Sequence, residues 1–121
     1  MATPAEALSF LRSNFKVEED GNLVTMLWNL DDDRKQIVFV SVRESILVIS
    51  SPIAEVGAVS AEQILKGNDS AWGVSLMGEY YMLNHIVLLE NADANEIAIP
   101  VELVAINADK VQNALGLGDK F

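Results

Sequence analysis

The chain has 121 residues, about the usual length of one domain, and half of them are hydrophobic, which is enough for one packed core. It carries 8 basic and 18 acidic residues, so its formal net charge is 8 − 18 = −10, and the scattered basic residues exclude nucleic-acid binding through a basic patch. The absence of cysteine excludes disulfides, zinc–thiolate sites and thiol catalysis.

The N-terminal stretch Met1-Ala2-Thr3-Pro4-Ala5-Glu6 has neither the basic start nor the apolar run of a secretory signal peptide. The apolar runs along the chain are all much shorter than the roughly 20 residues of a membrane-spanning helix. We therefore expect a cytoplasmic protein that binds no membrane. Its acidity favours a partner protein with basic or mixed charge.

The first helix is predicted over residues 4–16. Thr3 and Glu6 have the spacing of a capping box, and Pro4 suits the first helical position. Apolar residues then recur at helical spacing, at Leu8, Leu11 and Phe15. The polar stretch 19–22 ends this helix.

Three β-rich runs follow, at residues 23–30, 36–42 and 45–53. They are short and rich in β-branched side chains, and polar turns of hairpin length separate them. Pro52 ends the third run. The pattern predicts an antiparallel meander of three strands.

A second capping box at Ser60 and Gln63 opens a short helix that ends near Gly67. Residues 72–83 then alternate between apolar and polar side chains, Asn84 interrupts the pattern, and residues 85–90 read as a last strand. The two runs predict a second hairpin.

The longest helical segment begins after Asp93, which forms a third capping pattern with Glu96. One apolar stripe is expected to face the core: Ile97, Val101, Val104, Ala108, Val111 and Leu115. A second stripe, Ile99, Leu103 and Ile106, lies on the opposite side, where a helix on a sheet is usually polar. Because proline removes a helical hydrogen bond, the helix either starts late, at Pro100, or is kinked there.

The predicted fold is therefore α+β, with an antiparallel five-stranded sheet, the order α-β-β-β-α-β-β-α and helices packed on the sheet. We expect one domain over residues 1–121.

Several short segments, in one order along the chain, carry a family resemblance. They are Asp32-Asp33-Arg34-Lys35-Gln36, Ser51-Pro52, Tyr81-Met82-Leu83-Asn84-His85, Val104-Ala105, Ala108-Asp109 and Gly118-Asp119-Lys120-Phe121. This series, which extends over nearly the whole chain, resembles the YbjN-like family, whose members share the fold of the type III secretion chaperones.

The resemblance implies a helix–sheet–helix protomer that usually forms a homodimer and binds an extended or amphipathic segment of a client protein. YbjN-like proteins carry the label of sensory-transduction regulators, and a cyanobacterial branch with this fold includes a carboxysome-assembly chaperone that binds a shell-protein tail. The family supplies no catalytic residues to transfer to this chain.

Two residue groups suggest chemistry, and each has a simpler explanation. Asp31-Asp32-Asp33 offers carboxylates, but the glycine turn and the distal Glu of a calcium loop are missing, so a solvated turn is expected. His85 could act as a general base, yet no nucleophile motif accompanies it, and a structural role is expected. We predict no catalytic residues, no metal and no cofactor, and therefore no enzyme.

The better candidate is a partner or dimer surface formed by Ile99, Leu103, Ile106, Trp72 and Tyr81. The alternative is that these side chains are buried in the core of the protomer. The sequence thus predicts a protein-binding chaperone or adaptor that holds a client segment. A small YbjN-type regulator with a ligand between sheet and helix, or a chaperone of the carboxysome-assembly type, remains open.

Overall fold

The structure is a computed structural model that describes residues 3–30, 34–68 and 72–117. The described residues form one antiparallel sheet of six strands, in the order β1-β2-β3-β4-β6-β5. The strands are β1 (Val17–Asp20), β2 (Leu23–Asn29), β3 (Lys35–Val42), β4 (Ile46–Glu55), β5 (Gly73–Met77) and β6 (Tyr80–Leu88). The helices are α1 (Pro4–Asn14), α2 (Ala61–Gly67) and α3 (Ala94–Ala114), and a short 3-10 turn, η2 (Leu89–Asn91), precedes α3.

The predicted α+β class and the antiparallel sheet are confirmed, but the predicted number of five strands is wrong. The sixth strand is β1, which pairs with β2 directly after α1. The sequence of this strand, Val-Glu-Glu-Asp, reads as a turn because three of its four side chains are acidic. It forms a strand because β2 supplies its hydrogen-bond partners, Val17 packs on the core, and Arg12 of α1 binds Glu19 at 2.7 Å.

The second hairpin turns at a different point from the one predicted. The turn is at Gly78, whose φ of +60° suits glycine, and not at Asn84. Asn84 lies inside β6, where its side-chain amide donates to the Ser75 hydroxyl at 2.6 Å across the β5–β6 pair. The strand β4 likewise continues through Pro52 to Glu55.

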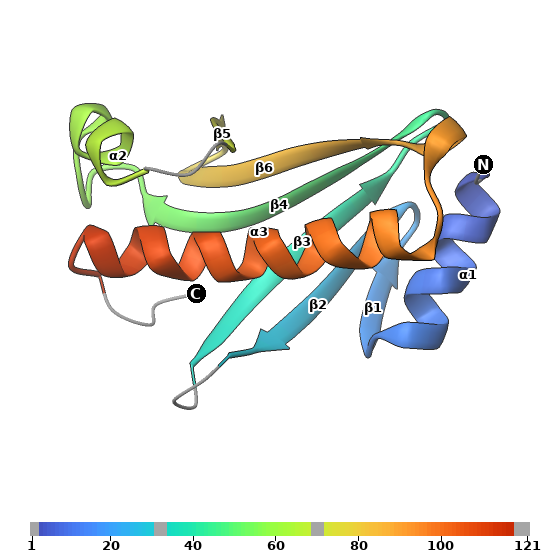
Figure 1. Cartoon of the computed structure of the whole chain (residues 1–121). Coiled ribbons are helices and arrows are strands. Elements are labelled where there is room, and N and C mark those ends of the chain that lie inside the picture. Colours follow the sequence, from blue (N-terminus) through green and yellow to red (C-terminus); the bar gives the residue numbers. More distant parts are fainter. Residues whose placement is uncertain (1–2, 31–33, 69–71, 118–121) are drawn as a thin grey trace.

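The helices pack on one face of the sheet, as Figure 1 shows for the long α3. Two clusters of buried apolar side chains lie between the helices and the sheet, one below α1 and the first half of α3, the other near α2 and the end of α3. The predicted core stripe of α3 is buried at Ile97, Val101, Val104, Ala108 and Val111, and Leu115 is half-buried.

The long helix begins at Ala94 and not at Pro100. The Asp93 carboxylate accepts a hydrogen bond from the backbone N–H of Glu96 at 2.9 Å, which fixes the start of the helix. Pro100 lies two turns inside a ribbon that Figure 1 shows as continuous. Since proline has no N–H, Pro100 cannot donate the helical hydrogen bond that the Glu96 carbonyl would otherwise accept from it.

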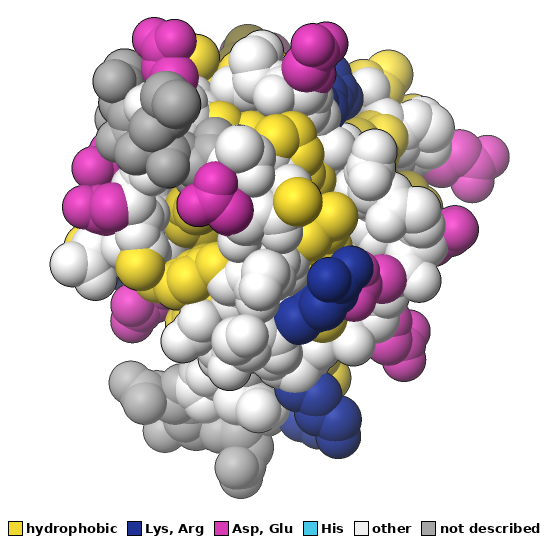
Figure 2. Space-filling model, turned by 90° about the vertical axis from the view of Figure 1, so that its right-hand side faces the viewer, with side chains coloured by type: hydrophobic (Ala, Val, Ile, Leu, Met, Phe, Trp, Pro, Cys, Tyr) yellow, Lys and Arg dark blue, Asp and Glu magenta, His cyan; other side chains and the backbone are white. Residues whose placement is uncertain are grey.

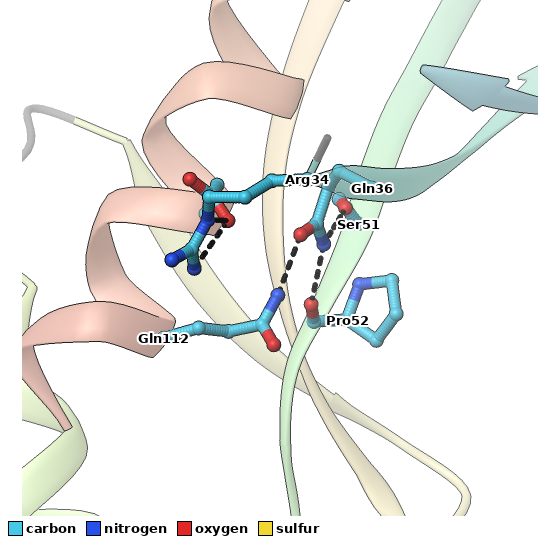
Figure 3. A network of polar contacts seen from close by, with 6 residues as sticks. Arg34, Gln36, Ser51, Pro52 and Gln112 are labelled. Atoms are coloured by element: carbon cyan, nitrogen blue, oxygen red, sulfur yellow. Dashed lines mark hydrogen bonds and ion pairs between the residues drawn. The ribbon is translucent and has the colours of Figure 1, made fainter. Parts of the chain in front are cut away.

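The sheet divides between β3 and β4. These strands pair only where Phe39–Val42 meets Leu47–Ser50, and the start of β3 diverges from the end of β4 (Figure 1). Side chains bridge the division on the helix face: Gln36 donates to the Ser51 hydroxyl at 2.7 Å and to the Pro52 carbonyl at 2.9 Å (Figure 3). The Ser51 hydroxyl donates in turn to the Ile37 carbonyl at 2.5 Å.

Two polar contacts then attach β3 and the residue before it to α3, as Figure 3 shows. Gln112 donates to the Gln36 side-chain oxygen at 2.5 Å, and both glutamines are fully buried. Arg34 binds the Asp109 carboxylate, with Nη2–Oδ1 and Nε–Oδ1 distances of 2.8 and 2.9 Å. These contacts hold the end of α3 over the divided part of the sheet.

Candidate protein-binding surface

The sheet face that points away from the helices is apolar. Side chains alternate between the two faces of a strand, and residues in register share a face. The core residues Met26, Val38 and Ile49 point toward the helices, so their neighbours along each strand point away. We call this surface the open face; its larger apolar side chains are Leu23, Leu27, Ile37, Phe39, Ile46, Val48, Ile86 and Leu88.

Several of these side chains are strongly exposed. Leu27, Ile86 and Leu88 each retain 55–56% of their accessible surface. In the described part of the chain the helices contribute to core clusters on the other side only, so they do not cover the open face. Contiguous exposed apolar surface of this kind marks a site of protein–protein interaction more often than isolated exposed residues do.

The open face contains an apolar pocket of about 310 Å³ where β3 and β4 diverge. Its lining comes from four strands: Ile37, Phe39, Pro52, Met77, Tyr80 and Met82. The nearby carbonyls of Ile37 and Pro52 already accept hydrogen bonds from Ser51 and Gln36. Because these polar groups are satisfied from inside, the pocket suits an apolar side chain of a partner.

The second stripe of α3 is only partly exposed. Ile99 and Leu103 are exposed by 52% and 39%, respectively. Ile106 is half-buried in a separate pocket of about 430 Å³, which lies between α3 and the side chains of Trp28, Leu30 and Arg34. The stripe is therefore exposed to solvent at Ile99 and Leu103 and ends at Ile106 in a pocket.

Trp72 and Tyr81, the other two predicted partner residues, are half-buried. Tyr81 packs on the second core cluster, and Trp72 contacts both clusters. The indole of Trp72 also meets the imidazole of His85 edge to face, with ring centroids 4.1 Å apart. The structure thus brings Trp72 together with His85, and it does not bring the two aromatic residues onto the open face.

The surroundings of His85 indicate a role in packing. Its pKa lies below the ordinary value because burial disfavours the charged imidazolium. Among the residues that the structure describes, no three His, Asp or Glu side chains gather in a way that could hold a metal ion. Asp31-Asp32-Asp33 lies outside the described residues.

The sequence contains an indication of the open face that a search for alternating apolar and polar residues does not reveal. A strand with one solvated face alternates apolar and polar residues, whereas 36–42 and 46–49 carry apolar side chains at nearly every position. Such runs are typical of strands covered on both faces. In the described part of the chain, helices cover only one of the two sheet faces, which leaves the other face available to a partner.

None of the helices in the described ranges has both the length and the hydrophobicity that are needed to cross a bilayer. A comparison with protein-family models and with curated proteins finds no match to this chain.

Proposed function

We infer that the protein is a non-enzymatic chaperone or adaptor that holds an apolar segment of a client protein. The exposed apolar open face is the observation that carries this proposal. Covering a fully exposed Leu or Ile side chain stabilises a complex by about 1.5–3 kcal/mol before the entropic cost of association. Several such side chains on one face therefore suffice for a complex of moderate affinity.

The charge of the chain fits a transient binding role. With a net charge of −10, copies of the chain repel one another, which keeps a protein with an exposed apolar face from associating without specificity. The same charge attracts basic segments of other proteins. We place this activity in the cytoplasm, and a homodimer formed through the open face is the competing arrangement.

A matched pair of variants tests the proposal. Leu27→Lys puts a charge on the open face, and Leu65→Lys makes the same change on α2, where the side chain is exposed by 71%. Affinity capture from the native cell, read by mass spectrometry, should lose its specific clients with Leu27→Lys and keep them with Leu65→Lys. Equal capture by both variants would remove the open face from the proposal.

Light scattering on the same proteins separates client binding from dimerisation. A wild-type mass of two chains that Leu27→Lys reduces to one would identify the open face as a homodimer contact. A wild-type mass of one chain leaves the face free for a client.

A second candidate function is a small regulator that binds a ligand between sheet and helix. The pocket beside Ile106 favours it, since this pocket combines the Trp28 indole with the charged side chains of Arg34, Asp109 and Lys110. A thermal-shift screen with metabolites would detect such a ligand, because binding to the native state raises the melting temperature. Loss of that shift in Lys110→Ala would assign the ligand to this pocket.

A further inference from the structure

The outer edge of β6 is only half covered by its neighbour. The strand β5 pairs with Tyr80–Asn84, and this pairing ends at Asn84. Among the described residues, no strand pairs with His85–Leu88 on the side away from β4. Within the described ranges this four-residue segment is therefore an edge strand, whose outward backbone groups form a template for another strand.

The direction of the free backbone groups follows from the ladder with β4. The Leu89 N–H donates to the Ser45 carbonyl at 3.0 Å, and this pair continues the register Leu47↔Val87. In an antiparallel ladder the residues that bond a given neighbour alternate. Val87 therefore bonds β4, while Ile86 and Leu88 direct their N–H and C=O groups outward.

A groove of about 580 Å³ lies along this edge. Its sides are His85–Leu88 of β6 and the first turns of α3, where Ile99 and Pro100 supply apolar surface. Ile86 and Leu88 border it from the open face, so the groove is continuous with that surface. A strand placed here would extend the sheet and the open face together.

The charges of the groove have one sign. Asp93 and Glu96 line it, and no Lys or Arg is among the described residues that do so. The Asp93 carboxylate caps α3, and Glu96 adds a second negative charge to the groove. Figure 2, which faces the right-hand end of the molecule in Figure 1, shows acidic and basic side chains around exposed hydrophobic ones.

We propose that the outer edge of β6 at His85–Leu88 binds an extended segment of the client as a seventh strand, and that this segment alternates apolar and basic side chains. The apolar residues lie beside Ile86 and Leu88, and the basic residues point to the other face, toward Glu96. The stem of a Lys or Arg side chain covers Ile99 while its charge stays near the carboxylate. This inference rests on the proposed function and specifies the client.

A second copy of the chain fits this edge less well. The whole of β6, Tyr80–Leu88, contains no Lys or Arg, so self-pairing would bring two acidic grooves together without a basic partner. Charge complementarity therefore selects a basic client segment.

The test uses the full chain and two synthetic peptides of about ten residues, one alternating valine and lysine, the other alternating valine and glutamate. Fluorescence anisotropy should show that the lysine peptide binds and the glutamate peptide does not. Ile86→Pro removes one outward N–H without touching the β4 ladder and should weaken binding about tenfold, whereas Ile86→Ala, which keeps that N–H, should weaken it less. Circular dichroism confirms that both variants are folded.

A charge reversal provides the second arm. Glu96→Lys should weaken binding of the lysine peptide about tenfold, and Glu102→Lys, the same change on α3 outside the groove, should alter it less than about threefold. Equal binding of both peptides, or wild-type affinity in Ile86→Pro, would overturn the inference. A dimer that Ile86→Pro dissociates would assign the edge to a second copy instead.

The two proposals can fail separately. If Leu27→Lys abolishes client capture while Ile86→Pro and Glu96→Lys bind clients normally, the open face is a binding surface and the edge of β6 is not. If neither surface affects capture, both proposals are wrong.

Discussion

The side chain of Gln112 donates a hydrogen bond to the side chain of Gln36 at 2.5 Å, although the two residues are 76 positions apart and neither is accessible to solvent. This contact joins α3 to the part of β3 that has diverged from β4. Since Gln36 also donates to Ser51 and to the Pro52 carbonyl, one buried amide connects three elements of the fold. The apolar pocket of the open face lies on the other side of this connection.

The first prediction concerns this buried pair. Gln112→Leu keeps a similar volume but leaves the Gln36 side-chain oxygen without its donor, so the free energy of unfolding should fall by about 1–3 kcal/mol. Urea denaturation followed by circular dichroism measures the change. Gln36→Leu should be worse, because it also deprives the Pro52 carbonyl of its donor. An unchanged midpoint for Gln112→Leu would contradict the network.

The second prediction concerns the Arg34–Asp109 ion pair. Both side chains are mostly buried, and Asp109→Asn removes the charge that faces the guanidinium, so stability should fall by about 1–3 kcal/mol. The exposed pair Glu62–Lys66 on α2 is the control, and Glu62→Gln should change stability by less than about 0.5 kcal/mol. Similar losses of stability in the two variants would show that burial does not determine how much each ion pair contributes to stability.

The third prediction is a pH dependence that His85 causes. Its pKa in the folded protein is lowered by burial below the ordinary value of 6.5, so the unfolded chain binds the proton more readily. The stability that neutral His85 contributes is therefore complete above about pH 6.5 and is lost as the pH falls toward the folded pKa.

His85→Gln should flatten this part of the profile of unfolding free energy against pH, and the difference between variant and wild type removes the contribution of the carboxylates. Trp72 gives a local readout, because an imidazolium against its indole changes the fluorescence. In a Trp28→Phe background the Trp72 emission should follow the same titration. A profile that is identical with and without His85 would show that burial does not shift its pKa.

The fourth prediction concerns the contact between α1 and the strand that the sequence did not reveal. The pKa of Glu19 lies below its ordinary value because the Arg12 guanidinium donates two hydrogen bonds to its carboxylate, at 2.7 and 2.8 Å. Arg12→Ala should raise the Glu19 pKa, which a carbon-detected NMR titration can follow. Lys66→Ala, which removes a positive charge from α2, should leave the Glu19 pKa as it is in the wild type; an equal rise in that variant would indicate a general change in charge and not a loss of this pair.

Several parts of the fold were predictable because their causes are local. Thr3, Ser60 and Asp93 each accept a hydrogen bond from a backbone N–H three residues later, so the chain itself marks these caps. For α3, Pro100 left a later start open, and the structure decided between the two. The core stripe of α3 was predictable for the same kind of reason, since helical periodicity alone places Val101, Val104 and Ala108 on one side.

The candidate site was only partly predictable. Periodicity identified the second stripe of α3, of which Ile99 and Leu103 are exposed. It could not separate them from Ile106, because the burial of Ile106 depends on how closely Trp28 and Arg34 approach the helix. It also gave no indication that Trp72 would meet His85, whose position is fixed by the pairing of β6 with β4.

The sequence by itself determined the α+β class, the antiparallel strands, the starts of α1 and α2 and the acidic surface, since each follows from residues close together in the chain. Only the tertiary structure decided the sixth strand, the turn at Gly78, the burial of Gln36 and Gln112 and the uncovered sheet face. Strand pairing and burial depend on partners many residues away, and whether a sheet face is covered depends on where all the helices pack. A local sequence pattern specifies neither the distance between residues that are far apart in the chain nor the sheet area that the helices cover. Only the packed fold therefore shows that Leu27, Ile86 and Leu88 are exposed.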